Sequence, residues 1–238
     1  MAPRRSTPSS DRRRGALAVE ARYDEAMRDF VGPRRPRYLP SLLALGLLAA
    51  PACSAAPAKT ASESARIVDV LALEPGEVVA DVGAGDGEWS EDLAKAVGAT
   101  GRVLATEVAA DELEKLRERI REHGLANVEV ISGDQESTGL PAGCCDAILV
   151  RMVYHHFQDP TAMRADLHRA LRPGGRIAIV DIKPQTSWRH LEGVPERGGH
   201  GIGPDELVRD MTASGFSVLS RRDDWNGDED RYCIVFGR

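Results

Sequence analysis

The sequence has few aromatic residues, few cysteines and no long apolar run. Phenylalanine, tyrosine and tryptophan make up 5% of its 238 residues, so we expect valine, leucine, isoleucine and alanine to form the core. The four cysteines show no C-x-x-C spacing, which argues against a zinc site. We expect no metal site, and we expect Cys144, Cys145 and Cys233 to be small core residues rather than disulfide partners.

The most apolar stretch of the chain lies within residues 39–53. It is roughly a dozen residues long, shorter than the ~20 that a membrane-spanning helix needs. Basic residues precede it and small residues follow, which is the layout of a bacterial secretory signal. Ala50-Pro51-Ala52 fits a cleavage site, and Cys53 resembles a lipoprotein cysteine. We therefore expect a signal or lipoprotein-like segment (1–53), a linker (54–61), and an exported or membrane-anchored protein. The alternative is an extension on a cytoplasmic enzyme.

Charge is distributed unevenly along the chain, whose formal net charge is −6. Residues 1–38 hold ten arginines against five carboxylates, a net charge of +5, so the remaining residues hold −11. An acidic domain repels a nucleic-acid backbone, so no nucleic-acid partner is expected.

Helical and strand patterns alternate from residue 62 onward, which predicts an α/β domain over residues 62–238. The expected fold is a Rossmann-like, doubly wound, mostly parallel seven-stranded sheet with helices on both faces and a C-terminal antiparallel hairpin. Ser62 is expected to cap a helix, as is Asp159, and Asp111 with Glu114 resembles a capping box. The helix after Asp159 should bury Leu171. The expected strands are 77–82, 102–107, 128–131, 146–150, 177–181, 216–220 and 232–236.

A glycine-rich loop, Asp81-Val-Gly-Ala-Gly-Asp-Gly87, follows the first expected strand and leads into a helix. Glycines let a backbone turn tightly and approach a ligand closely. A dinucleotide fingerprint would need a further glycine where the chain has Glu88, which argues against a nicotinamide-dependent reductase. Glu107 ends the second strand, where a carboxylate can accept hydrogen bonds from both ribose hydroxyls.

The D-x-G-x-G-x-G spacing resembles motif I of class I S-adenosylmethionine-dependent methyltransferases. Residues 146–157 resemble motif IV of that family, and residues 171–180 resemble motif V. Tyr154-His155-His156-Phe157 before Asp159-Pro160 is similar to the small-molecule branch that includes ubiquinone and menaquinone C-methyltransferases. The resemblance covers about residues 62–238.

The resemblance implies S-adenosyl-L-methionine as cofactor and a role for each matching residue. It implies that Asp81 helps to hold the methionine end of the cofactor and that Asp134 contacts the adenine amino group. Candidate general bases are His155 and His156, and Tyr154 is a candidate for positioning the methyl acceptor. The expected cofactor-binding residues are Asp81, Gly83, Ala84, Gly85, Gly87, Glu107, Asp134, Gln135 and Arg151.

The expected function is in-line transfer of a methyl group to a small-molecule acceptor. One alternative is a catalytically degenerate, cofactor-binding envelope lipoprotein. Another is a nucleic-acid or protein methyltransferase, although no Asn-Pro-Pro-Tyr-type motif follows the fourth strand. In the long loop 183–203, we expect Trp188, His190 and His200 to be at the surface or to serve packing rather than to bind substrate.

Overall fold

The computed structural model describes residues 62–188 and 190–238 of the chain. The predictions for the signal segment, its cleavage site, Cys53 and the linker lie outside these residues. No helix in the described ranges is long and apolar enough to cross a membrane.

A seven-stranded sheet runs through the described unit in the order β3-β2-β1-β4-β5-β7-β6. The strands β1 to β5 are parallel to one another, whereas β7 is antiparallel to both β5 and β6. This topology confirms the predicted parallel sheet with a C-terminal antiparallel hairpin at one edge. The strands are β1 (Val78–Val82), β2 (Arg102–Glu107), β3 (Val128–Ser132), β4 (Cys145–Arg151), β5 (Leu171–Ile182), β6 (Ser217–Arg222) and β7 (Arg231–Gly237).

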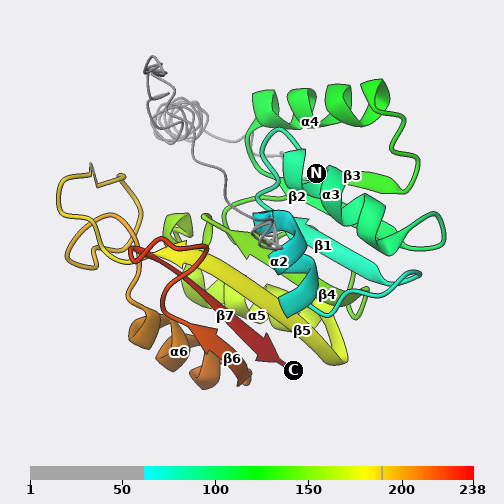
Figure 1. Ribbon diagram of the computed structural model, residues 1–238. Helices are drawn as coiled ribbons and strands as arrows, with labels where there is room; N and C mark the ends of the chain where they lie inside the picture. The colour runs from blue at the N-terminus through cyan, green and yellow to red at the C-terminus, as the bar shows by residue number, and fades with distance from the viewer. Residues whose placement is uncertain (1–61, 189) are drawn as a thin grey trace, which may run out of the picture. The chain divides into compact units, whose positions relative to one another are not determined.

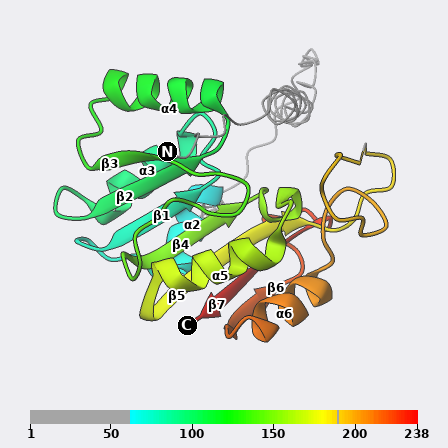
Figure 2. The same ribbon diagram turned by 180° about the vertical axis from the view of Figure 1, so that it is seen from behind.

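Helices cover both faces of the sheet, as predicted (Figures 1 and 2). Alternate side chains of a strand point to opposite faces, so each central strand supplies two cores. Val79 packs with α2 and α3, whereas its neighbour Ala80 packs with α5 and α6. Ala105 packs with Leu116 of α4 on the α3 side. The helices are α2 (Glu63–Val70), α3 (Glu88–Val97), α4 (Ala110–Glu122), the 3-10 turn η1 (Tyr154–His156), α5 (Pro160–Ala170) and α6 (Pro204–Ala213).

Two of the three predicted helix caps are present. The Ser62 side chain accepts a hydrogen bond from Ala65 N, and Asp159 accepts from two backbone N–H groups of α5. The capping box of Asp111 and Glu114 is wrong, because α4 begins at Ala110 and has no side-chain cap. Just before the helix, Oε1 of Glu107 accepts hydrogen bonds from Val108 N and from Ala109 N at the N-cap position.

The helix expected to bury Leu171 ends one residue earlier, at Ala170. Leu171 is fully buried but extended, and it begins β5 by pairing with Cys145. Pro173 favours an early end, because it pushes Arg172 toward extended backbone and helices usually end at or before the residue that precedes a proline. The strand is therefore longer than the predicted 177–181, with a bulge in its pairing to β4.

Asp166 of α5 holds the loop that follows β3 against the domain. Its Oδ2 accepts from Thr138 N at 2.8 Å and from Thr138 Oγ1 at 2.6 Å, and both residues are buried. Asp166→Ala should lower the free energy of unfolding by about 2–3 kcal/mol, because a buried N–H group loses its acceptor. Urea denaturation measures this change. Glu118→Ala, which removes an exposed carboxylate on α4, is the control and should change stability by less than about 0.5 kcal/mol.

Candidate cofactor and acceptor site

The glycine loop turns directly after β1 and is tied to β2 by backbone hydrogen bonds. Gly83 N and Ala84 N donate to Thr106 O at 2.9 and 3.0 Å. Gly83 has φ +72°, and a Cβ there would lie 2.5 Å from a methyl group of Val153. Gly85 has φ +55°, but a Cβ there would meet no atom within 4 Å. The loop is thus packed on one side at Gly83 and has open space beside Gly85, where a ligand can approach the backbone.

Glu107 stands at the end of β2 beside this loop, and its side chain is buried. Its Oε2 accepts from Gly85 N at 3.0 Å, which fixes the loop relative to the neighbouring strand. A carboxylate has about four lone-pair sites, and Gly85 N, Val108 N and Ala109 N donate to three of them, so about one is left for a ligand hydroxyl. The geometry places Gly85 and Glu107 in direct contact beside Gly83 and Ala84, and cofactor binding by these residues stays a prediction.

Asp81 is the carboxylate of β1, is buried, and lies just before the turn into the glycine loop. Ser90 Oγ donates to its Oδ2 at 2.6 Å from the first turn of α3. Burial raises the pKa of Asp81 to about 6, against the opposing effects of the Ser90 hydrogen bond and the Arg151 charge. The charge of Glu107 raises the pKa further. A buried anion of this kind is stabilised by a cationic ligand.

Arg151 ends β4 and is held from two sides. Its guanidinium lies 4.1 Å from the centre of the Trp89 ring, and its Nε and Nη2 donate to the carboxylate of Glu63 at 3.3 Å. Glu63 also accepts from Trp225 Nε1 at 2.9 Å. Glu63 and Trp225 carry no signal in the sequence, because their contacts join residues 88 and 162 positions apart in the chain. Ser90 carries none because no motif marks it.

Asp134 and Gln135, the expected adenine-side residues, are exposed in the loop after β3. Asp134 Oδ1 accepts from Glu136 N and Ser137 N, at 2.9 and 2.8 Å. These bonds shape the loop and leave the second carboxylate oxygen at the surface. A contact with adenine stays a prediction for both residues.

His155 and His156 follow β4 in η1, and both are buried. Asp181, at the end of β5, lies 2.5 Å from His155 Nδ1, and its Oδ2 accepts from His155 N at 3.2 Å. His155 Nε2 lies 3.0 Å from Nε2 of His200. Burial lowers the pKa of His156 well below 6.5, and the neighbouring imidazoles His155 and His200 lower it further. His156 is therefore neutral at pH 7.

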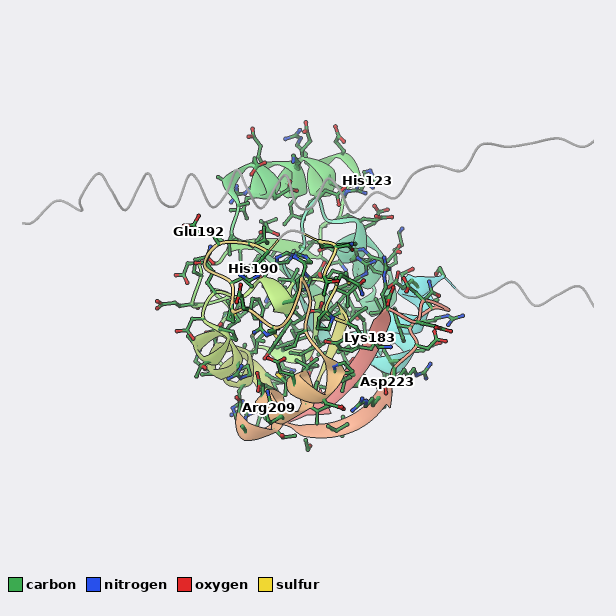
Figure 3. The ribbon with its side chains drawn as sticks, turned by 90° about the vertical axis from the view of Figure 1, so that its left-hand side faces the viewer. His123, Lys183, His190, Glu192, Arg209 and Asp223 are labelled. Atoms are coloured by element: carbon green, nitrogen blue, oxygen red, sulfur yellow. The ribbon has the colours of Figure 1, made fainter. Side chains whose placement is uncertain are left out.

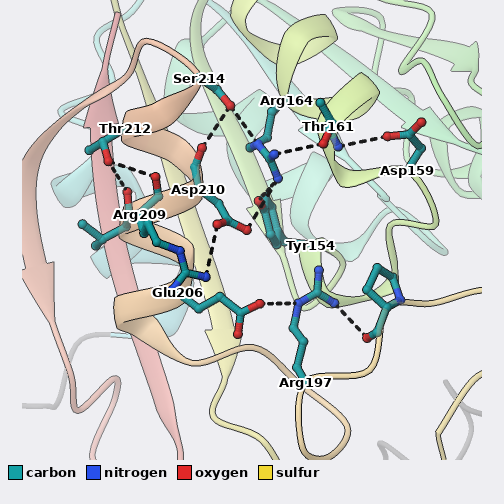
Figure 4. A network of polar contacts seen from close by, with 12 residues as sticks. Tyr154, Asp159, Thr161, Arg164, Arg197, Glu206, Arg209, Asp210, Thr212 and Ser214 are labelled. Atoms are coloured by element: carbon teal, nitrogen blue, oxygen red, sulfur yellow. Dashed lines mark hydrogen bonds and ion pairs between the residues drawn. The ribbon is translucent and has the colours of Figure 1, made fainter.

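The Tyr154 side chain lies in the core, away from the imidazoles of its two neighbours in sequence. Its hydroxyl accepts from Arg164 Nη1 at 3.1 Å, and Arg164 Nε also donates to Ser214, the C-cap of α6 (Figure 4). Tyr154 is fully buried, and burial raises its pKa. This geometry supports a packing role that links α5 to α6, and the expected role in positioning an acceptor stays a prediction.

The loop from 183 to 203 carries the other residues named from the sequence. His190 and Glu192 are exposed on it, and Lys183 lies at its base (Figure 3). Trp188 is 42% exposed, and its ring centre lies 5.4 Å from that of His200. His200 is buried against His155 rather than at the surface.

Neither Asp181 nor its contact with His155 was predicted from the sequence. The signal that could have identified Asp181 is its place at the end of a strand, the same position that identified Glu107.

Comparisons with known proteins agree with this geometry. A family described as "Methyltransferase domain" matches residues 79–175. Nocamycin O-methyltransferase of Saccharothrix syringae is 33% identical over 134 residues, which cover 56% of this chain and 48% of that protein. Demethylmenaquinone methyltransferase of Listeria welshimeri is 28% identical over 124 residues, which cover 51% of this chain and 52% of that protein. The chain thus spans about half the length of these relatives.

Solved structures share the fold. An S-adenosylmethionine-dependent methyltransferase from Aquifex aeolicus matches 73% of this chain and 88% of its own, with a TM-score of 0.62 and 23% identity. The 4+2 cyclase SpnF matches 74% of this chain and 80% of its own, with a TM-score of 0.61 and 17% identity. Since a cyclase shares the fold, the fold alone does not fix the reaction. Residues 79–175 thus match a methyltransferase domain in sequence, and the described unit has the fold of S-adenosylmethionine-dependent methyltransferases.

Proposed function

We propose that this protein transfers a methyl group from S-adenosylmethionine to a small-molecule acceptor. The observation that carries the proposal is the joint position of the glycine loop, Asp81 and Glu107 at the carboxyl ends of β1 and β2. Ligands of open α/β sheets bind beyond these strand ends. The open space beside Gly85 fits a ligand that lies close to the backbone.

The residues of the chain have separable roles in this proposal. Glu107 holds the loop and offers its remaining acceptor site to a ribose hydroxyl, while Asp81 supplies a buried negative charge for the cationic methionine end. The cofactor itself supplies the activated methyl group on a sulfonium. The protein therefore acts mainly through alignment and the exclusion of water, which can be worth about 7–11 kcal/mol of the barrier.

The acceptor side is formed by the residues that follow β4 and β5. His155 is oriented by Asp181, and the neutral His156 can accept a proton. Assignment of either histidine as the general base stays a prediction. The relatives named above are an O-methyltransferase and a menaquinone-pathway methyltransferase, which supports a small organic acceptor carrying a hydroxyl or an aromatic ring.

Calorimetric titration of the full chain with S-adenosylmethionine tests the cofactor site. Glu107→Gln should weaken binding about 10- to 100-fold, because an amide offers one acceptor oxygen where the carboxylate offers two, and a hydrogen bond to a charged group is worth about 1.5–3 kcal/mol. Glu129→Gln is the matched control, since Glu129 is exposed on β3 and pairs with Arg102. A folded wild-type protein that binds no cofactor would contradict the proposal and favour a degenerate protein.

Export or membrane anchoring through residues 1–53 is a second part of the proposal. It is supported by the basic, apolar and small-residue order of that segment and by Cys53. Fractionation of a bacterium that expresses the full chain should find the protein in the envelope. Cys53→Ser should release a lipid-anchored protein from the membrane fraction, and a wholly cytoplasmic wild-type protein would contradict this part.

A further inference from the structure

Three imidazoles gather where η1 meets the return of the long loop. They belong to His155, His156 and His200, which are 2%, 7% and 8% exposed. One nitrogen from each side chain can be chosen such that all three lie within 4.8 Å of one another. No other group of histidine, cysteine or acidic side chains among the described residues has the spacing of a metal site. The sequence did not suggest it, because two of the histidines are adjacent and the third is 44 residues beyond His156.

Asp181 orients the imidazole of His155 in the way that a carboxylate commonly orients a metal-binding histidine. Its Oδ1 lies 2.5 Å from His155 Nδ1, so the ring proton is placed on Nδ1. The lone pair of His155 is then on Nε2, which points toward His200 Nε2 at 3.0 Å. A carboxylate bonded to the distal nitrogen of a ligating histidine is the usual outer partner in zinc sites, where it fixes the tautomer.

The distances are close to those of a tetrahedral centre. With metal–nitrogen bonds of 2.0–2.1 Å, two ligands of a tetrahedral zinc ion lie about 3.3 Å apart. The separation of His155 and His200 is 3.0 Å. The His156 ring centre lies 4.0 and 5.2 Å from those of His155 and His200, and one of its nitrogens lies within 4.8 Å of a nitrogen of each.

The backbone fixes the third histidine in place. Gln185 and His200 form an antiparallel bridge, with N···O distances of 2.8 and 3.1 Å, and Ile202 N donates to Ile182 O. Gly201 has φ +121°, and a Cβ there would lie 2.7 Å from Ile182 O, so only glycine allows this close return. The position of His200 therefore follows from backbone pairing and does not depend on the rotamer alone.

We propose that His155, His156 and His200 bind a late first-row divalent cation, with Zn²⁺ as the probe, and that Asp181 orients His155. Imidazole is a preferred ligand of such cations. Three protein ligands leave a fourth position for water or for an oxygen of the acceptor, as in catalytic zinc sites. A bound cation would lie at the carboxyl ends of β4 and β5, on the acceptor side of the proposed reaction. Only this last point, a contact with the acceptor, depends on the proposed function.

The test is metal binding by the full chain, prepared without a polyhistidine tag and measured with no cofactor or acceptor present. Elemental analysis after dialysis against Zn²⁺ should find one equivalent per chain, and Co²⁺ should give the visible absorption of a four- or five-coordinate site. His200→Ala should lower the affinity at least 10-fold, because a ligand is lost. His123→Gln is the matched control, since His123 is exposed at the C-cap of α4 and pairs with Glu91; it should bind as the wild type does.

A second measurement separates loss of the site from loss of the fold. Zn²⁺ at 100 times its dissociation constant should stabilise the wild type by RT ln 101, or about 2.7 kcal/mol, while Mg²⁺ should not. His200→Ala should lose that increment even if its own melting temperature is lower. Zn²⁺ binding that is equally strong in wild type and His200→Ala, or no binding by the wild type, would overturn the inference. In the second case, the imidazoles form only a buried hydrogen-bonded cluster. Neither result bears on cofactor binding, which the Glu107→Gln titration measures separately.

Discussion

Replacing Asp81 by asparagine should make the cofactor-free protein more stable at pH 8 and should weaken its binding of S-adenosylmethionine about 10- to 100-fold. The two effects have one cause, the buried negative charge. Burial raises the pKa of Asp81 from 3.8 to about 6, so the folded protein holds this charge at a cost when the pH is above 6. The cost is about 3 kcal/mol at pH 8, from about 1.4 kcal/mol for each unit of pKa.

The sign of the pH dependence follows from linkage. Between about pH 4 and pH 6 the folded state binds more protons at Asp81 than the unfolded state, so the wild type gains stability from this group as the pH falls through that window. Asp81→Asn lacks this gain. The difference in unfolding free energy between variant and wild type should thus be largest above pH 7 and should shrink toward zero near pH 4.

Urea denaturation over this pH range, together with calorimetric titration of the cofactor at pH 8, measures both effects. Asp92→Asn, on the same helix as Ser90, is the control, because Asp92 pairs with Lys95 at the surface. It should leave stability and cofactor affinity nearly unchanged. An Asp81→Asn variant that is less stable than the wild type at pH 8 would contradict the destabilising effect of this buried charge. A variant that binds the cofactor as tightly as the wild type would contradict its role in binding.

Alanine at Gly83 and at Gly85 should damage the protein in two different ways. At Gly83 the added Cβ would lie 2.5 and 2.8 Å from the two methyl groups of Val153, and φ is +72°. We expect Gly83→Ala to lower the free energy of unfolding by about 2–4 kcal/mol, from left-handed backbone strain and overpacking. At Gly85 the strain alone remains, about 1–2 kcal/mol, but the Cβ would occupy the open space assigned to the ligand.

Gly85→Ala should therefore weaken cofactor binding more than it lowers stability, whereas Gly83→Ala should mainly lower stability. Gly124→Ala provides the control, because Gly124 has φ +61° and open space but lies after α4, outside the proposed site. Thermal melts and calorimetric titration of all three variants separate the effects. If Gly85→Ala bound the cofactor as well as Gly124→Ala does, the open space beside Gly85 would not be the ligand position.

The sequence predicted the parts of the site that follow strands in a recognisable pattern. Asp81, the glycines and Glu107 come directly after β-branched runs, and parallel strands bring such residues to one edge of the sheet. The same rule applies to Asp181, but no glycine loop follows it to mark its strand end. The position of His200 could not be predicted, because it depends on the backbone pairing of His200 with Gln185. The length of the loop does not reveal which of its residues pair.

Local patterns also failed in two places. The capping box at Asp111 did not form because α4 begins at Ala110, which puts Asp111 inside the first helical turn rather than at the N-cap. Leu171 was correctly expected to be buried, but the pairing of β5 with β4 replaced the helix that was expected to bury it. For Leu171, a tertiary contact outweighed a propensity read from a few neighbouring residues.

The contact between Glu63 and Trp225 has a consequence for the order in which the domain forms. The two residues are 162 positions apart, and the Arg151 bond to Glu63 spans 88 positions. Closing such long loops costs entropy before the contacts stabilise the chain, so contacts of high sequence separation slow folding. During synthesis, α2 is made first, but its Glu63 can gain its last partner only when the C-terminal hairpin has left the ribosome. The first described helix of the domain is thus expected to be among the last to dock.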